Sequence, residues 1–276
     1  MLDVVRRVAL LAALAVMLAA GWTAAADAKG KKNSGALPDD LATFVLGNTI
    51  FTLFHEFGHA LIDKLEIPVL GREEDAVDAL AVLLMLPEED DPVAEEMILL
   101  AADGHLMAYD QEDDDEQAFW DEHSLDLQRY AAINCLVFGS DPEGWAELAE
   151  LVEMPAEQQQ RCPGIFDQTQ ISWDRLLDEH YRTDGDTSGG KAKLRFKKPG
   201  AGVDRRLVEL LKKSEALKAA VDLVSELFIL PGDFEVIFES CKDANAYYFP
   251  ETGNISMCYE LVGYFAELYE NDDSAE

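Results

Sequence analysis

The sequence predicts an α+β protein that is mainly helical and carries a small sheet near its C-terminal end. Apolar residues recur at helical spacing through most of the stretch from Leu41 to about Val152. Closer to the C-terminus, "DFEVIFESC" alternates like a strand, and "NAYYFPETGNISM" has the pattern of two short strands joined at Pro250 to Gly253. With 276 residues, the chain is long enough to bury a full core.

The first 26 residues have the layout of a secretory signal peptide. An arginine pair, Arg6 and Arg7, precedes thirteen apolar residues from Val8 to Ala20, and Ala24-Ala25-Ala26 offers a cleavage site. The alternative is an uncleaved membrane anchor, but the apolar run is shorter than the about 20 residues that span a bilayer. We therefore expect an exported protein, periplasmic or secreted, with no stable membrane insertion after cleavage. A polar spacer follows at residues 27–40.

The region 41–182 is predicted to be helical. One largely apolar helix should run from Leu41 to about Leu65, where "EIPVLG" ends it, and a second from about Glu73 to Leu86, where Pro87 follows. Further helical patterns are "PVAEEMILLAADGHLMAYD", "LDLQRYAAINCLVFG" and "GWAELAELV".

Residues 183–202 are rich in glycine and lysine and poor in apolar side chains, which predicts a flexible loop. The region 203–276 should then add an amphipathic helix, "RRLVELLKKSEALKAAVDLVSELFIL", the small sheet, and a C-terminal helix, "CYELVGYFAELYE". We expect it to belong to the same folded unit as the helical region.

The charge and the cysteines restrict the environment and the partners. Fifty-five acidic against 22 basic residues give a net charge of −33, which repels nucleic acid and anionic lipid headgroups. All four cysteines lie beyond the predicted signal peptide, where disulfides can form. We favour Cys135 with Cys162 and Cys241 with Cys258, because each pair closes a short loop.

The stretch "FTLFHEFGHALIDKL" contains the motif H-E-x-x-H. On a helix, His55 and His59 lie one turn apart on the same face, so both imidazoles can bind one metal ion. Glu56 follows the first histidine and is placed to take a proton from a water at the metal. The alternative is a core helix that happens to contain histidines.

The next predicted helix offers the missing ligand. "GREEDAVDAL" places Glu74 and Asp78 four residues apart on one face. A catalytic zinc usually takes three protein ligands, so we expect one Zn²⁺ per chain on His55, His59 and Glu74. Asp78 would orient one of the ligating histidines. Glu73 is the rival third ligand, but it has no acidic residue four positions on.

H-E-x-x-H followed on another helix by E-x-x-x-D resembles the pattern of the gluzincin metallopeptidases, the thermolysin and neprilysin group. The stretch "HEFGHALIDKLEIPVLGREEDAVD" also resembles a bacterial family of exported proteins described as putative metallopeptidases. "DEHSLDLQR" matches a neprilysin-like stretch. That resemblance implies that His123 donates a hydrogen bond to the oxyanion, that Asp121 holds its imidazole, and that Arg129 binds a substrate carbonyl.

"NAYYFPETGNISM" is similar to the edge strand that neprilysin-like enzymes use to hold the substrate backbone. The resemblance implies a zincin-like domain in which Asn245 and Ala246 bind an extended peptide. In those enzymes the edge strand precedes the H-E-x-x-H helix, whereas here it follows far downstream. A true match therefore implies a circularly permuted chain, which is compatible with termini that lie close together at the surface.

The sequence as a whole favours a zinc-dependent metallopeptidase that acts on a peptide or protein substrate, with Glu56 as general base. One alternative is an exported scaffold protein with a structural or inactive zinc site, for which His105 or His180 would supply a fourth ligand. Another is a zinc amidase that acts on cell-wall material by the same chemistry.

Overall fold

The computed structural model describes residues 37–87, 91–111, 120–183 and 185–272. The predicted signal peptide and most of the polar spacer lie outside these residues. The helices are α3 (Asp39–Lys64), α4 (Glu73–Met85), α5 (Pro92–Gln111), α6 (Asp126–Ser140), α7 (Ala146–Leu151), α8 (Ala156–Leu177), α9 (Arg205–Lys213), α10 (Glu215–Leu227) and α11 (Tyr259–Glu270), with a 3₁₀ turn at Asp178–His180. The strands are β1 (Ala192–Phe196), β2 (Phe234–Glu239), β3 (Ala246–Phe249) and β4 (Asn254–Cys258).

The predicted α+β class is confirmed. The four strands form one mixed sheet in the order β1-β2-β4-β3, in which β1, β2 and β4 are parallel and β3 runs antiparallel to β4. This leaves β1 and β3 as the two edge strands. The register places Ala246 opposite Met257 and Tyr248 opposite Ile255.

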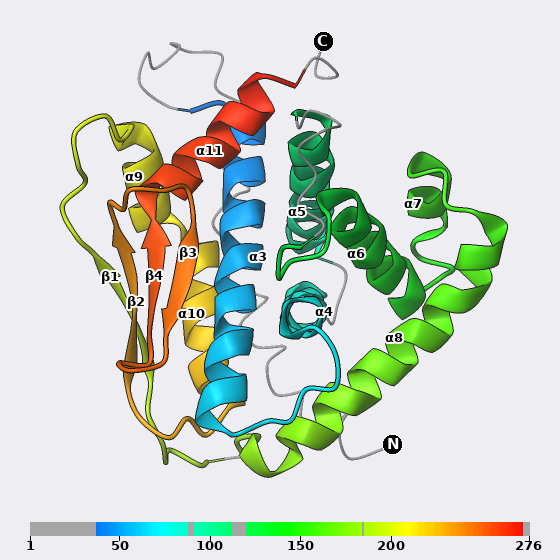
Figure 1. Ribbon diagram of the computed structural model, residues 1–276, viewed down its shortest axis with the longest axis horizontal. Helices are drawn as coiled ribbons and strands as arrows, with labels where there is room; N and C mark the ends of the chain where they lie inside the picture. Colours follow the sequence, from blue (N-terminus) through cyan, green and yellow to red (C-terminus); the bar gives the residue numbers. More distant parts are fainter. Residues whose placement is uncertain (1–36, 88–90, 112–119, 184, 273–276) are drawn as a thin grey trace.

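Helix α3 occupies the centre of the molecule. Figure 1 shows it between the sheet on one side and α4, α5 and α6 on the other. Its apolar residues occur on all sides, as in a helix that is packed all round, and most of them are buried. The helix begins after Pro38, whose carbonyl accepts from the Ala42 amide, with Asp39 and Asp40 in the first turn, where negative charge is favourable.

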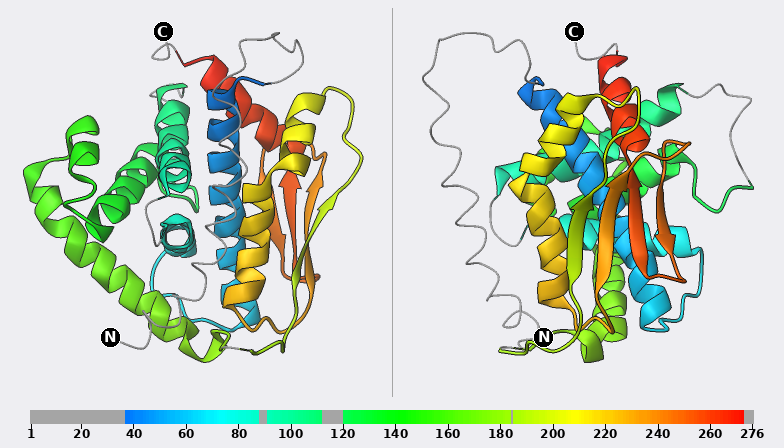
Figure 2. Two further views of the ribbon diagram at one scale, coloured as in Figure 1. Left: turned by 180° about the vertical axis from the view of Figure 1, so that it is seen from behind. Right: turned by 90° about the vertical axis from the view of Figure 1, so that its left-hand side faces the viewer.

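Helices α3 and α10 cover one face of the sheet, as the right-hand view of Figure 2 shows. Strand β3 lies beside α3, so the edge strand and the motif-bearing helix are neighbours. Both predicted disulfides are present: Cys135–Cys162 joins α6 to α8, and Cys241–Cys258 joins the segment after β2 to the end of β4. Within the described ranges, no helix is long and apolar enough to cross a membrane.

Three elements differ from the sequence-based expectation. The segment 183–202, expected as a flexible loop, contains β1, because Leu194 and Phe196 face the packed side while Lys193 and Arg195 face solvent. The single helix expected after it is two helices that meet at Ser214, whose hydroxyl accepts from the Leu217 amide and caps α10. Helix α8 lies in the region predicted to be helical, but it was not singled out as an individual helix, since it is largely polar and contains Pro163.

Candidate metal centre

Helices α3 and α4 bring the predicted ligands together. His55 and His59 lie one turn apart near the C-terminal end of α3, and Glu74 is the second residue of α4. A close approach of the two helices makes this possible: a Cβ added at Gly58 would lie 2.6 Å from the side chain of Val77, in the next turn after Glu74. Glycine within the motif therefore lets α4 bring its carboxylate to the histidines.

The three ligand atoms form a compact group. Glu74 Oε2 lies 3.0 Å from His55 Nε2 and 3.3 Å from His59 Nε2, and the two Nε2 atoms are 3.2 Å apart. Within the described part of the chain, this is the group of His, Cys, Asp and Glu side chains that could hold a metal ion. His55 is buried, while His59 and Glu74 are partly accessible, so the group is open on one side.

Each of these two histidines pairs with a carboxylate through Nδ1, the ring nitrogen that lies away from the group. Asp78 Oδ1 is 2.7 Å from His55 Nδ1, and Glu73 Oε1 is 2.8 Å from His59 Nδ1. Because a carboxylate at Nδ1 fixes that nitrogen as the protonated one, Nε2 of both rings is left with a lone pair toward the group. Asp78 therefore lies where it was expected. Glu73, the rival ligand, orients His59 instead.

Asp78 is itself paired with Arg129 of α6. Arg129 donates from Nε to Oδ2 at 2.7 Å and from Nη2 to Oδ1 at 2.8 Å. Burial opposes the charge on each group. Arg129 and His55 outweigh it at Asp78, whose pKa is far below its ordinary value, and Asp78 outweighs it at Arg129, whose pKa is raised. The buried pair fixes α6 against α4 directly behind the metal group.

His123 also points at the metal group. Its Nε2 lies 3.1 Å from Glu74 Oε2, and its Nδ1 is 2.9 Å from Asp121 Oδ1. Two bonds connect its loop to the start of α4: Arg72 donates to the His123 carbonyl at 3.0 Å, and Ser124 donates to Asp75 at 2.6 Å. The structure thus brings the predicted pair of His123 and Asp121 to the site.

The charges around Glu74 are strongly coupled. Burial favours its neutral form, but His123, His55 and His59 outweigh burial and hold the pKa of Glu74 far below the ordinary carboxyl value. Burial lowers the pKa of His59, but Glu74 and Glu73 raise it to about 9. Glu74 and Asp121 together overcome burial to raise the pKa of His123 to about 9. The negative charge of Glu74 thus favours positive charge beside it, here protons on the histidine rings, which a bound metal ion would replace.

Glu56 differs from these carboxylates. It is buried at 7% exposure, and burial raises its pKa above the ordinary glutamate value, although His55 and His59 pull in the opposite direction. A carboxylate with a raised pKa is a stronger base than an ordinary glutamate, which suits a proton acceptor beside a metal group.

The donor set fits a divalent metal ion. Two imidazole nitrogens and one carboxylate oxygen are the ligands that zinc takes in catalytic sites. Glu74 Oε2 is buried and accepts no well-formed hydrogen bond, although three imidazole nitrogens surround it. An ion shared between this oxygen and the histidines would satisfy it.

The remaining predicted residues lie farther along the chain. Asn245 and Ala246 stand at the start of β3, where the Asn245 side chain accepts from the Ala246 amide at 2.9 Å and its carbonyl accepts from Cys258 at 3.2 Å. Neither His105 nor His180 joins the metal group within the described residues. His105 pairs with Asp126 at 2.7 Å, and His180 lies in the 3₁₀ turn.

A cavity of about 350 Å³ lies between α4 and α6, next to the pair of Asp78 and Arg129. Its apolar lining comes from Ala79, Val82, Ala132, Ile133 and Leu136. Sequence reasoning did not indicate this cavity, nor the pairs of Glu73 with His59 and Ser124 with Asp75. The acidic residues at the start of α4 were the sequence signal that could have indicated the pair of Glu73 with His59.

The comparison with protein families agrees with the expected resemblance. A family model described as putative metallopeptidase matches residues 15–177 and 196–276. No curated protein and no solved structure matches the chain significantly. Because the two matched ranges span most of the chain and include the whole metal group, the chain belongs to this family of putative metallopeptidases.

Proposed function

We propose that the protein is an exported zinc-dependent peptidase that cleaves peptide bonds with Glu56 as general base. The observation that carries this proposal is the group of His55, His59 and Glu74 with a buried glutamate beside it. The two disulfides support a periplasmic or extracellular location, because such bonds persist in oxidising compartments.

When bound, the zinc ion would supply Lewis acidity, which acidifies a water molecule and polarises the scissile carbonyl. Glu56 takes the proton of the attacking water and delivers it to the leaving amine, a role that its raised pKa supports. His123, held by Asp121, donates a hydrogen bond to the oxyanion of the tetrahedral intermediate.

Substrate binding would use Arg129 and the edge strand. The two bonds to Asp78 occupy Nε and Nη2 of Arg129, so a substrate carbonyl would bind at Nη1. The free edge of β3, beginning at Asn245 and Ala246, can pair with an extended peptide through main-chain hydrogen bonds, which give affinity with little sequence preference.

The test compares three proteins in parallel: the wild type, Glu56→Gln and Glu74→Ala. We expect one zinc per wild-type chain by elemental mass spectrometry, with chelator-sensitive cleavage of a quenched mixed-peptide library. Glu56→Gln should keep the zinc and the fold but lose activity by at least about 10³-fold, because the base is gone. Glu74→Ala should lose the zinc as well.

Glu226→Gln, on the exposed surface of α10, is the matched control and should behave as the wild type. Full activity in Glu56→Gln would remove the assigned base. Zinc without peptide cleavage, but with release of fragments from cell-wall muropeptides, would move the reaction to amide bonds of cell-wall material.

A further inference from the structure

Polar bonds connect the C-terminal end of edge strand β3 to the last turn of the metal-binding helix. The Tyr248 hydroxyl donates to Asp63 Oδ2 at 2.6 Å, and Lys64 Nζ donates to the Pro250 carbonyl at 2.8 Å. Lys64 Nζ also lies 2.8 Å from Asp63 Oδ2. The three side chains thus form one small network between α3 and the β3–β4 hairpin.

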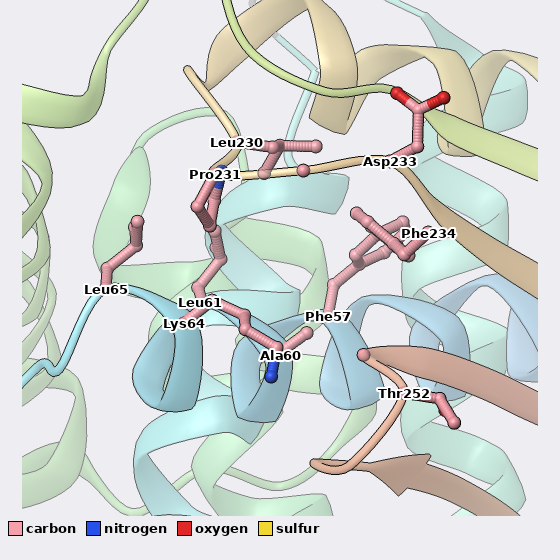
Figure 3. Close-up of a pocket in the computed structure, with 12 residues that line it drawn as sticks. Phe57, Ala60, Leu61, Lys64, Leu65, Leu230, Pro231, Asp233, Phe234 and Thr252 are labelled. Carbon is pink, nitrogen blue, oxygen red and sulfur yellow. The ribbon is translucent and has the colours of Figure 1, made fainter.

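Packing beneath this hairpin is incomplete. A cavity of about 260 Å³ separates the end of α3 from the hairpin turn and from the segment that leads into β2 (Figure 3). It is lined by residues at the end of α3 and directly after it, by residues 230–234, and by Thr252 and Gly253 of the turn; the first set is Phe57, Ala60, Leu61, Lys64 and Leu65. At this point the turn approaches α3 through Lys64, whose Cε lies 3.2 Å from the position of a Cβ at Gly253.

We propose that Tyr248, Asp63 and Lys64 are positioning residues, which hold β3 in place against α3 and so set the affinity for an extended peptide substrate. This inference rests on the proposed function, in which β3 pairs with the substrate backbone. It adds the residues that give the strand its position.

The network is suited to this task because it belongs to the same rigid element as the metal ligands. Asp63 comes one turn after His59 on α3. The position of a strand bonded to Asp63 is therefore fixed relative to the metal group through one helix. The other end of β3 is also fixed, because the Cys258 amide donates to the Asn245 carbonyl and Cys258 is disulfide-bonded to Cys241. With both ends held, the strand can bind a peptide without first being ordered.

Tyr248→Phe tests the proposal in the metal-loaded protein, since it removes the hydroxyl and keeps the ring. We expect KM for a peptide substrate to rise about three- to tenfold while kcat stays within about twofold, because binding of the ground state and of the transition state is weakened equally. Zinc content and Tm should match the wild type. Tyr109→Phe, which removes the same hydroxyl from a tyrosine of α5 and so outside β3 and the metal group, is the matched control and should leave KM unchanged.

A double-mutant cycle checks that the residues act together. Asp63→Ala should raise KM at least as much as Tyr248→Phe does, and the double variant should add little to Asp63→Ala, since both single variants remove the same bond between Tyr248 and Asp63. A merely structural role would instead lower Tm or zinc content in proportion to the loss of activity.

Hydrogen exchange of the substrate-free protein gives a readout that needs no catalysis. Amides of residues 246–249 should exchange faster in Tyr248→Phe than in the wild type or in Tyr109→Phe, while amides around His55 stay unchanged. If the wild type cleaved no peptide, the proposed function would be wrong. Faster exchange of residues 246–249 in Tyr248→Phe would still show that the network holds β3. Wild-type exchange and wild-type KM in Tyr248→Phe would overturn the inference, as would a rise in KM that accompanies loss of zinc.

Discussion

At the metal group, each histidine ligand is held by a carboxylate, but the two carboxylates have different surroundings. Asp78 is only 12% exposed and accepts two bonds from buried Arg129, whereas the side chain of Glu73 is 46% exposed. A buried charge pair is costly to break, because the remaining charge keeps its desolvation cost and loses its partner. The two outer carboxylates should therefore differ in importance.

We predict that Asp78→Asn lowers zinc affinity about 10- to 100-fold, because His55 loses the group that fixes its ring. It should also lower the free energy of unfolding by on the order of 3 kcal/mol, because Arg129 is left without a counter-charge. Glu73→Gln is the matched control, and it should lower both the zinc affinity and the free energy of unfolding by less than Asp78→Asn does. Competition with a fluorescent chelator measures the affinity, and urea unfolding measures the stability. Equal losses in the two variants would contradict this reading.

Some features of the metal group could be predicted from the sequence, and others could not. The spacing of His55, His59, Glu74 and Asp78 was enough to predict their arrangement, since helical periodicity places each pair on one face. The Arg129–Asp78 pair was not predictable, because it joins residues 51 positions apart on different helices. Glu73 was considered as a ligand, and only the relative position of α3 and α4 shows that it orients His59.

At the scale of elements, prediction succeeded where the pattern is local. Helices α3 and α4 and strands β2 to β4 follow from periodicity and punctuation by proline and glycine. Strand β1 was missed because Lys193, Arg195 and the following Lys197 resemble a solvated loop. Their partners Asp233, Glu235 and Glu239 lie in β2 or directly before it, far along the chain. Helix α8 packs on α6 through Cys162 and a few apolar residues, so its own pattern is weak.

The contact between α3 and α4 makes a prediction at this scale. Gly58→Ala places a methyl group 2.6 Å from the side chain of Val77 and 3.2 Å from its Cα, so α4 must move away from α3. We expect a loss of about 1–3 kcal/mol in stability. Zinc affinity should fall as well, because Glu74 moves with α4.

Gly263→Ala in α11 is the control for that variant. A Cβ at Gly263 meets nothing within 4 Å, so this variant should gain about 0.5–1 kcal/mol by the higher helix propensity of alanine. Thermal unfolding and chelator competition measure both variants. Wild-type zinc affinity in Gly58→Ala would show that the close helix contact does not position Glu74.

At the scale of the whole molecule, charge is the dominant feature. A net charge of −33 in 276 residues means that the average interaction between charged side chains on the surface is repulsive. Ten of the 22 basic residues lie between positions 191 and 218, and several of them form exposed ion pairs, such as Arg195 with Glu235 at 3.0 Å. Exposed pairs of this kind contribute at most about 1 kcal/mol each. We therefore expect repulsion among the excess acidic groups to outweigh the contribution of these ion pairs.

We predict that salt stabilises the protein. At 0.5 M NaCl the screening length is well below the about 10 Å found at 0.1 M, so long-range repulsion is largely removed while the buried pair of Asp78 and Arg129 is hardly affected. Tm of the zinc-loaded protein should rise by at least about 3 °C between 10 mM and 0.5 M NaCl. Sucrose at equal osmolality is the control for effects of solute exclusion. If NaCl raised Tm no more than sucrose does, or lowered it, then the exposed ion pairs would matter more to stability than the repulsion among acidic groups.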